Sequence, residues 1–194
     1  MLNEVKSRQA GNEEMVIAGF GGQGVLSMGQ ILCYSGVMEE KEVSWMPSYG
    51  PEMRGGTANC IVIISDKEIS SPILTKFDTV IALNQPSIDK FEKAVKPGGL
   101  FLYDISAAVN PPTRTDIDVV GIDAANEAAK MKNTKILNMI MLGAFLKKKP
   151  IIEFENILKG LKKVLPERYH HLIPLNEQAL KRGMELAEGV GISA

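Results

Sequence analysis

Near its start the polypeptide reads Met15-Val16-Ile17-Ala18-Gly19-Phe20-Gly21-Gly22-Gln23-Gly24, and this segment determines the class of fold. An apolar run with high β propensity ends here in the pattern G-x-G-x-x-G. From residue 24 to residue 38 the apolar residues recur at helical spacing instead, with Val25, Met28 and Leu32 on one face. The sequence therefore predicts a strand, a tight glycine turn and a helix in succession.

Further strands and helices alternate along the rest of the chain. We expect strands at 42–46, 57–65, 79–83, 99–103 and 119–122. We expect helices at 87–95, 124–131, 136–146, 153–164 and 175–187, the late ones covering one face of the sheet or extending toward a partner. This alternation predicts an α/β, Rossmann-like fold: a mainly parallel sheet with helices on both faces and a helical C-terminal part. Residues 1–14 form a polar tail in this interpretation, and 15–194 form a single domain.

The composition argues against several classes of protein. The 194 residues carry a formal net charge of −1, which gives no long-range attraction to nucleic acid or to an anionic membrane. No apolar run approaches the roughly 20 residues that span a bilayer, and residues 1–14 lack the apolar stretch of a secretory signal. We therefore expect a cytoplasmic protein. Cys33 and Cys60 are too few for an iron–sulfur cluster or a zinc ion, and adjacent His170 and His171 lack metal-ligand spacing, so we expect no metal site.

The glycine turn suits an anion, but the residues alone leave its ligand open. Glycines let a phosphate approach the backbone, and the start of the next helix offers unpaired N–H groups at the positive end of its dipole. A nicotinamide-binding fold also carries an acid at the end of its second strand. Here that strand ends in Met46-Pro47-Ser48, which argues against NAD. Three roles are open for the turn. It can serve only to shape the backbone, it can bind a phosphate-bearing ligand, or it can contribute to a subunit interface.

A second unusual loop follows the second predicted strand, at 48–56. It holds Pro51, three glycines, Tyr49 and a single arginine, Arg54, and it follows Pro47 and the only tryptophan, Trp45. Arg54 can place its guanidinium on a phosphate or carboxylate, or it can pair with a surface acid such as Glu52. The aromatic residues are equally typical of partner surfaces. Because the carboxyl ends of parallel strands meet at one edge of a sheet, we expect this loop and the glycine turn to face one crevice.

Together the two loops resemble the gamma subunit of 2-oxoacid:ferredoxin oxidoreductases. The resemblance rests on the glycine turn and on Ser48-Tyr49-Gly50-Pro51-Glu52-Met53-Arg54-Gly55-Gly56, and it is closest to the variants that use 2-oxoglutarate or branched-chain 2-oxoacids. Shorter matches follow at Leu83-Asn84-Gln85-Pro86, Asn138-Met139, Leu142-Gly143, Asn176, Ala179 and Gly183. The similarity thus runs from Met15 to Ala187.

This resemblance implies a subunit of a multi-chain enzyme rather than a complete catalyst. The complex would convert a 2-oxoacid to an acyl-CoA and pass electrons to ferredoxin, with 2-oxoglutarate favoured, then a branched-chain 2-oxoacid or pyruvate. Thiamine diphosphate and iron–sulfur clusters would lie on partners, namely thiamine-binding alpha and beta subunits and a ferredoxin-like subunit or ferredoxin. This chain would hold no cofactor alone, share coenzyme A with its partners, and could form a homodimer when isolated. The candidate contacts are Gly21, Gly22, Gln23, Gly24, Arg54 and Asn84, and no catalytic residue is identified.

Two rival interpretations stay open. The chain could be a stand-alone Rossmann-type regulatory protein that binds a nucleotide or coenzyme A. It could also be purely structural, with both loops serving as contact surface and no ligand at all. The partner-like loop around Trp45 argues against an independent protein, so the subunit hypothesis leads.

Overall fold

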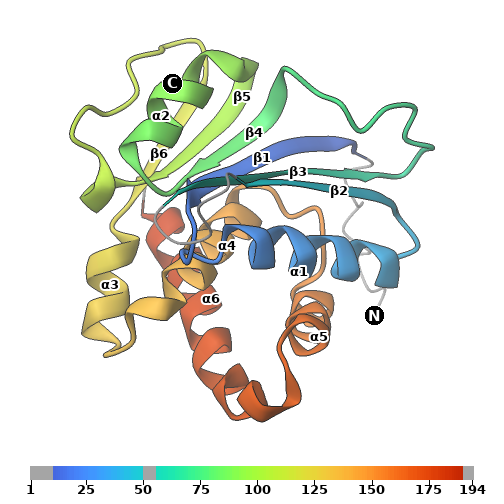
Figure 1. Ribbon diagram of the computed structural model, residues 1–194, viewed down its shortest axis with the longest axis vertical. Coiled ribbons are helices and arrows are strands. Elements are labelled where there is room, and N and C mark those ends of the chain that lie inside the picture. The colour runs from blue at the N-terminus through green and yellow to red at the C-terminus, as the bar shows by residue number, and fades with distance from the viewer. Residues whose placement is uncertain (1–10, 50–55, 190–194) are drawn as a thin grey trace, which may run out of the picture.

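The computed structural model describes residues 11–49 and 56–189. A six-stranded sheet in the order β2-β3-β1-β4-β5-β6 forms the centre of this part of the chain (Figure 1). Its strands are β1 (Glu13–Phe20), β2 (Glu42–Tyr49), β3 (Thr57–Ser65), β4 (Phe77–Ala82), β5 (Val95–Asp104) and β6 (Asp118–Ile122). β1, β4, β5 and β6 pair in parallel, which confirms the predicted mainly parallel α/β sheet.

β3 departs from the parallel arrangement, because it runs antiparallel to both of its neighbours. Met15 of β1 lies opposite Val62 of β3, and Trp45 of β2 lies opposite the same residue on the other side. A short connection can join antiparallel strands, whereas parallel strands need a longer crossover. The connection between β2 and β3 is short enough to impose the antiparallel pairing.

Helices cover the two faces of the sheet unequally. They are α1 (Val25–Met38), α2 (Gln85–Phe91), α3 (Ala124–Lys130), α4 (Leu137–Lys148), α5 (Phe154–Val164) and α6 (Ile173–Glu188), with short 3-10 turns η1 (Glu92–Ala94), η2 (Ile105–Ala107), η3 (Thr134–Ile136) and η4 (Glu167–Leu172). Figure 1 shows α2 on one side of the sheet and the other α-helices on the opposite side. Within the described residues, no helix combines the length and apolar character needed to cross a bilayer.

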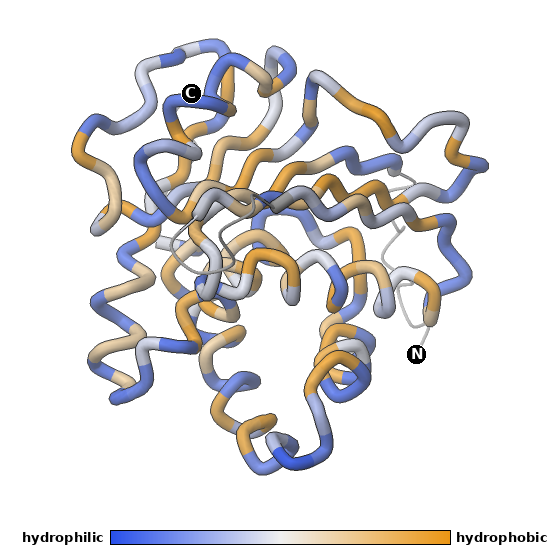
Figure 2. The backbone as a smooth tube through the Cα atoms, in the orientation of Figure 1, coloured by the Kyte–Doolittle hydropathy of each residue, from blue (hydrophilic) through white to orange (hydrophobic). Residues whose placement is uncertain are grey.

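Two hydrophobic cores reflect this division. Met15 and Ile17 point from β1 into the larger core with the C-terminal helices, whereas Val16 points into a smaller core beneath α2. Figure 2 shows apolar residues along the strands and hydrophilic residues in most peripheral connections. β1 begins at Glu13, inside the predicted polar tail. Glu13 is 5% exposed and accepts a hydrogen bond from the Thr79 hydroxyl, so its partner across the sheet allows a charged residue type to enter the strand.

α4 and α6 approach each other backbone to backbone. A Cβ atom added at Gly143 would overlap the carbonyl of Leu180, and one added at Gly183 would overlap the carbonyl of Ile140. All nine residues from Asn138 to Leu146 of α4 are buried. The late helices therefore build the core on one face of the sheet.

Because α4 and α6 are in backbone contact, adding one methyl group at Gly183 should destabilise the protein. Gly183→Ala should lower the free energy of unfolding by about 1–3 kcal/mol, since the added atom forces the two helices apart. Gly189→Ala is the matched control, because Gly189 follows the same helix at φ −73° and an added Cβ there would lie 3.8 Å from the Leu186 carbonyl oxygen, an ordinary contact. Urea denaturation of both variants measures the difference, and a Gly183→Ala protein as stable as the control would contradict this packing.

Candidate functional site

The glycine turn lies at the carboxyl end of β1, as predicted. Gly22 and Gly24 adopt φ angles of 97° and 78°, a region that residues with a Cβ atom rarely occupy. At Gly24 a Cβ atom would also overlap the side chain of Asn138, so α4 closes against the turn at this point. The turn therefore needs glycine for its conformation at both positions and for space at the second.

α1 starts from this turn with open hydrogen-bond donors. Gly24 is its N-cap residue, and in the described part of the chain no side chain caps the helix and no acid lies in its first turn. The backbone N–H groups of Val25, Leu26 and Ser27 precede the first intrahelical bond, which Met28 donates to Gly24. With the positive end of the helix dipole, these groups make the start of α1 suited to an anion.

Gln23 serves as a brace within the turn. Its Oε1 accepts a hydrogen bond of 2.6 Å from the Phe20 N–H, and its Nε2 donates one of 3.1 Å to the Leu83 carbonyl at the end of β4. The side-chain amide is thus engaged inside the protein. The backbone N–H of Gln23 is engaged as well, because it donates a hydrogen bond of 3.1 Å to the Phe20 carbonyl.

The two loops singled out in the sequence meet at the same edge of the sheet. The Gly21 N–H donates a hydrogen bond of 2.8 Å to the carbonyl of Gly56, which precedes β3. β2 points the same way as β1, because both are antiparallel to β3. The predicted convergence is confirmed at these two residues. Arg54 lies outside the described residues.

A hollow of about 690 Å³ opens beside the start of α1. Its walls come from the glycine turn, the first turn of α1 and the ends of β2 and β3: Phe20, Gly21, Gly22, Gly24, Val25, Leu26, Ser27, Trp45, Pro47 and Ala58. Most of these side chains are apolar, and the backbone N–H groups of α1 supply polarity at one end. This combination suits an amphipathic ligand with an anionic group.

Asn84 occupies the carboxyl end of β4, one strand away. It is 3% exposed, and its Oδ1 accepts a hydrogen bond of 2.9 Å from the Ser87 N–H as the N-cap of α2. Its Nδ2 is buried and has no hydrogen-bond partner among residues 11–49 and 56–189. Asn84 therefore shares the edge with the glycine turn but does not line the hollow.

The two cysteines and His170 lie in environments that favour a structural role over a catalytic one. Burial raises the pKa of the Cys33 and Cys60 thiols to about 12 each, so both stay protonated at neutral pH. His170 Nε2 lies 2.8 Å from the Leu165 carbonyl and 3.1 Å from the Lys162 carbonyl, where the ring caps the end of α5. Across the described ranges, no three His, Cys, Asp or Glu residues are grouped to hold a metal ion.

Known proteins with similar sequences include 2-oxoacid oxidoreductases and their subunits. The family model described as pyruvate ferredoxin/flavodoxin oxidoreductase matches residues 14–186. The 2-oxoglutarate synthase subunit KorC of Methanocaldococcus jannaschii is 31% identical over 186 residues, which cover 94% of this chain and 98% of that subunit. The ketoisovalerate oxidoreductase subunit VorA of Methanothermobacter thermautotrophicus is 43% identical over 130 residues, and the match spans 27% of its length.

Solved structures show the same fold. The gamma subunit of a keto/oxoacid ferredoxin oxidoreductase from Geobacter sulfurreducens is 27% identical and superposes with a TM-score of 0.78, over 92% of this chain and 99% of that one. The 2-oxoglutarate:ferredoxin oxidoreductase from Magnetococcus marinus, solved with 2-oxoglutarate, coenzyme A and succinyl-CoA bound, has a TM-score of 0.85. At 23% identity, and with 32% of that chain covered, this second similarity is evidence for the fold alone.

The hydrogen bonds of Gln23 can be tested by removing the donor that faces the Leu83 carbonyl. Gln23→Glu replaces the donor that faces the Leu83 carbonyl with a carboxylate oxygen, so we expect the free energy of unfolding to fall by about 1–3 kcal/mol. Gln30→Glu is the control, since Gln30 lies on α1 and makes no side-chain hydrogen bond within the described structure. Thermal melts at neutral pH compare the two, and equal losses would show that Gln23 has no special role.

Proposed function

The chain belongs to the pyruvate ferredoxin/flavodoxin oxidoreductase family, and we propose that it serves as the gamma-type subunit of a 2-oxoacid:ferredoxin oxidoreductase. The proposed complex decarboxylates a 2-oxoacid oxidatively, forms an acyl-CoA and passes electrons to ferredoxin. The match to KorC along nearly its whole length supports 2-oxoglutarate as the favoured substrate. The higher identity to part of VorA keeps a branched-chain 2-oxoacid next, followed by pyruvate.

Within that complex, we assign this chain a share of the coenzyme A site. The observation that carries the assignment is the uncapped start of α1 beside the hollow of about 690 Å³. Coenzyme A joins phosphates to a long, weakly polar arm, which matches backbone N–H donors next to an apolar wall. Arg54, from the loop that follows β2, is the proposed side-chain partner of a phosphate.

The chemistry itself falls to partner subunits in this proposal. The described residues hold protonated cysteines, a histidine that caps a helix, and no grouped metal ligands. We infer that thiamine diphosphate is held by alpha and beta subunits, and iron–sulfur clusters by those chains or a ferredoxin-like subunit. The contribution of this chain is to bind and orient the acyl acceptor.

Purification from the native host tests the subunit assignment. A tagged copy of this chain should bring down near-stoichiometric thiamine-binding chains, together with iron and 2-oxoacid-dependent reduction of a dye. The acid that supports reduction identifies the substrate. Recovery of a lone, colourless protein under conditions that preserve such complexes would overturn the assignment in favour of a free-standing binding protein.

A charge placed at the start of α1 tests the coenzyme A role. Ser27→Asp should raise the KM for coenzyme A about tenfold through repulsion of phosphate, while the melting temperature stays equal or rises, because an acid in the first turn favours the helix. Ser27→Asn is the neutral control of similar shape. Arg54→Ala should raise the same KM without loss of partner chains. Unchanged KM values for both Ser27→Asp and Arg54→Ala would contradict the role even if the complex assembles.

A further inference from the structure

The connection from β5 to β6 holds apolar side chains in solvent. Val109 is 82% exposed and Ile105 is 44% exposed. Residues 105–113, which we call the apolar loop, include no charged residue. Exposed apolar side chains in a stretch without charge are typical of the centre of a protein–protein interface, where charged residues are depleted.

The backbone that carries Val109 is fixed by one side chain of α2. The Oδ1-like oxygen of the Gln85 amide, Oε1, accepts hydrogen bonds from the N–H groups of Val109 and Asn110 at 2.7 and 2.9 Å. The Nε2 of Gln85 donates at 3.1 Å to the Asn110 carbonyl and at 2.6 Å to Asp89, which orients the amide. The exposed side chain of Val109 is therefore presented from a defined position beside the first turn of α2.

A second side chain holds the far end of the apolar loop. Glu92 accepts hydrogen bonds from the N–H groups of Thr113 and Arg114 at 2.6 and 3.0 Å. Pro111 and Pro112 have no N–H group to satisfy. Each backbone N–H from residue 109 to residue 114 is thus bonded within the protein or absent. A partner can cover this backbone without leaving a donor unpaired, and docking costs little conformational entropy.

The apolar loop begins at the same edge of the sheet as the candidate site. β1 and β5 both run parallel to β4, so η2 leaves the end of β5 at the edge where the glycine turn follows β1. The two strands are two strand spacings apart, about 10 Å. An interface of standard size covers about 800 Å² on each partner and is wider than this separation. One partner can therefore cover the candidate site and the apolar loop together.

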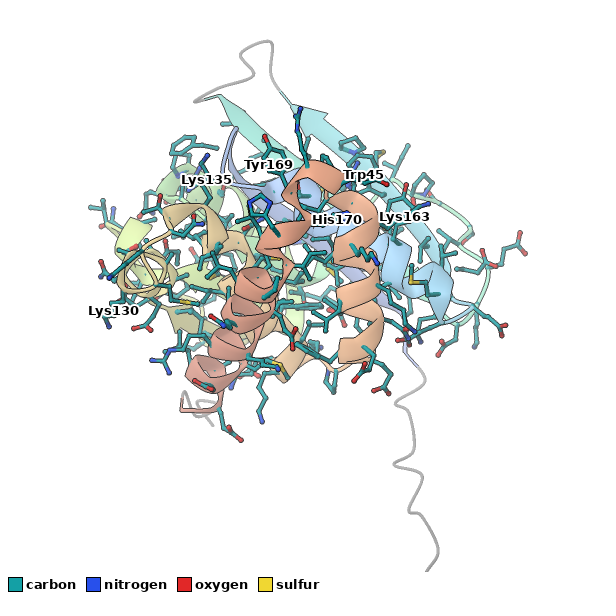
Figure 3. All side chains as sticks on the ribbon, turned by 90° about the horizontal axis from the view of Figure 1, so that it is seen from below. Trp45, Lys130, Lys135, Lys163, Tyr169 and His170 are labelled. Atoms are coloured by element: carbon teal, nitrogen blue, oxygen red, sulfur yellow. The ribbon has the colours of Figure 1, made fainter. Side chains whose placement is uncertain are left out.

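Other exposed surfaces have a different character or position. Figure 3 shows Lys130, Lys135 and Lys163 on the face formed by the helices below the sheet, and all three lysines are exposed. Ile73 is 73% exposed, but it belongs to the connection from β3 to β4, which lies at the opposite end of the strands (Figure 1). Exposure like that of Val109 thus recurs at Ile73, away from the candidate site.

We propose that the apolar loop is the surface through which a thiamine-binding subunit docks against the carboxyl edge of the sheet. The inference rests on the proposed function, in which this chain binds coenzyme A and a partner holds thiamine diphosphate. The thiol of coenzyme A has to reach the partner's cofactor, so that partner has to lie at the edge where the ligand is bound. Val109 and Ile105 then enter an uncharged, apolar surface of the thiamine-binding subunit, as anchors of the contact.

Co-purification of tagged variants from the native host tests the contact. Val109→Asp places a charge in an apolar interface, so the thiamine-binding chains recovered per tagged chain should fall at least about tenfold. The variant alone should melt at the same temperature as the unaltered chain, because this side chain is exposed. Val109→Ile should retain the partners. Ile73→Asp is the matched control, with the same charge on a similarly exposed β-branched residue, and it should retain them as well.

The other outcomes separate this inference from the function on which it rests. If the unaltered chain recovers no thiamine-binding chain, the proposed function fails. If it does, and Val109→Asp recovers as much, only the docking surface is wrong. Equal losses in Val109→Asp and Ile73→Asp would overturn the location. Val109→Asp that retains the thiamine-binding chains but loses a ferredoxin-like chain, or loses self-association, would assign the apolar loop to that other partner or to a second copy.

Kinetics of the remaining complex distinguish docking from ligand binding. Complex that still assembles with Val109→Asp at high protein concentration should keep the unaltered KM for coenzyme A, because the apolar loop does not line the hollow beside α1. Ser27→Asp should show the reverse pattern, a raised KM with partners retained. A raised KM in Val109→Asp with full recovery of partners would place the loop at the ligand and overturn its role in docking.

Discussion

The close approach of α4 and α6 constrains most of the structure beneath the sheet. Gly143 and Gly183 let two backbones meet where any side chain would hold them apart. α4 consequently lies deep enough for Asn138 to contact Gly24 at the start of α1. The position of the glycine turn relative to the C-terminal helices therefore depends on helix packing well away from the turn itself.

Local patterns in the sequence were sufficient to predict the order of strands and helices. They also predicted that the candidate site lies at the carboxyl edge of the sheet. The glycine turn, the helix after it and the strand at 57–65 each follow from residues adjacent in the chain. The direction of β3 did not follow, because a strand with apolar residues on both faces is compatible with either pairing. Its direction depends on the connection from β2. The inclusion of Glu13 in β1 was likewise hidden, since its partner Thr79 is distant in sequence.

The detailed roles of the site residues depended on contacts that periodicity cannot reveal. Gln23 was expected beside a ligand, and its side chain instead reaches the Leu83 carbonyl, 60 positions along the chain. Gln85 and Glu92 likewise hold residues 109–114, which lie beyond the next strand in the chain. No spacing rule connects them. Arg54, the side chain most suggestive in the sequence, lies outside the described residues, and its contact with a phosphate is a proposal.

The brace formed by Gln23 has a further consequence for the timing of binding. Because its hydrogen bonds fix the turn between β1 and α1 against the end of β4, the backbone donors at the start of α1 are already in place without a ligand. Binding there loses little conformational entropy, and the encounter needs no rearrangement of this turn. In the proposed coenzyme A role, the carrier would arrive as the free thiol and depart acylated in every turnover. A preorganised turn would let that exchange proceed at rates set by the ligand's own contacts rather than by a slow opening of the protein.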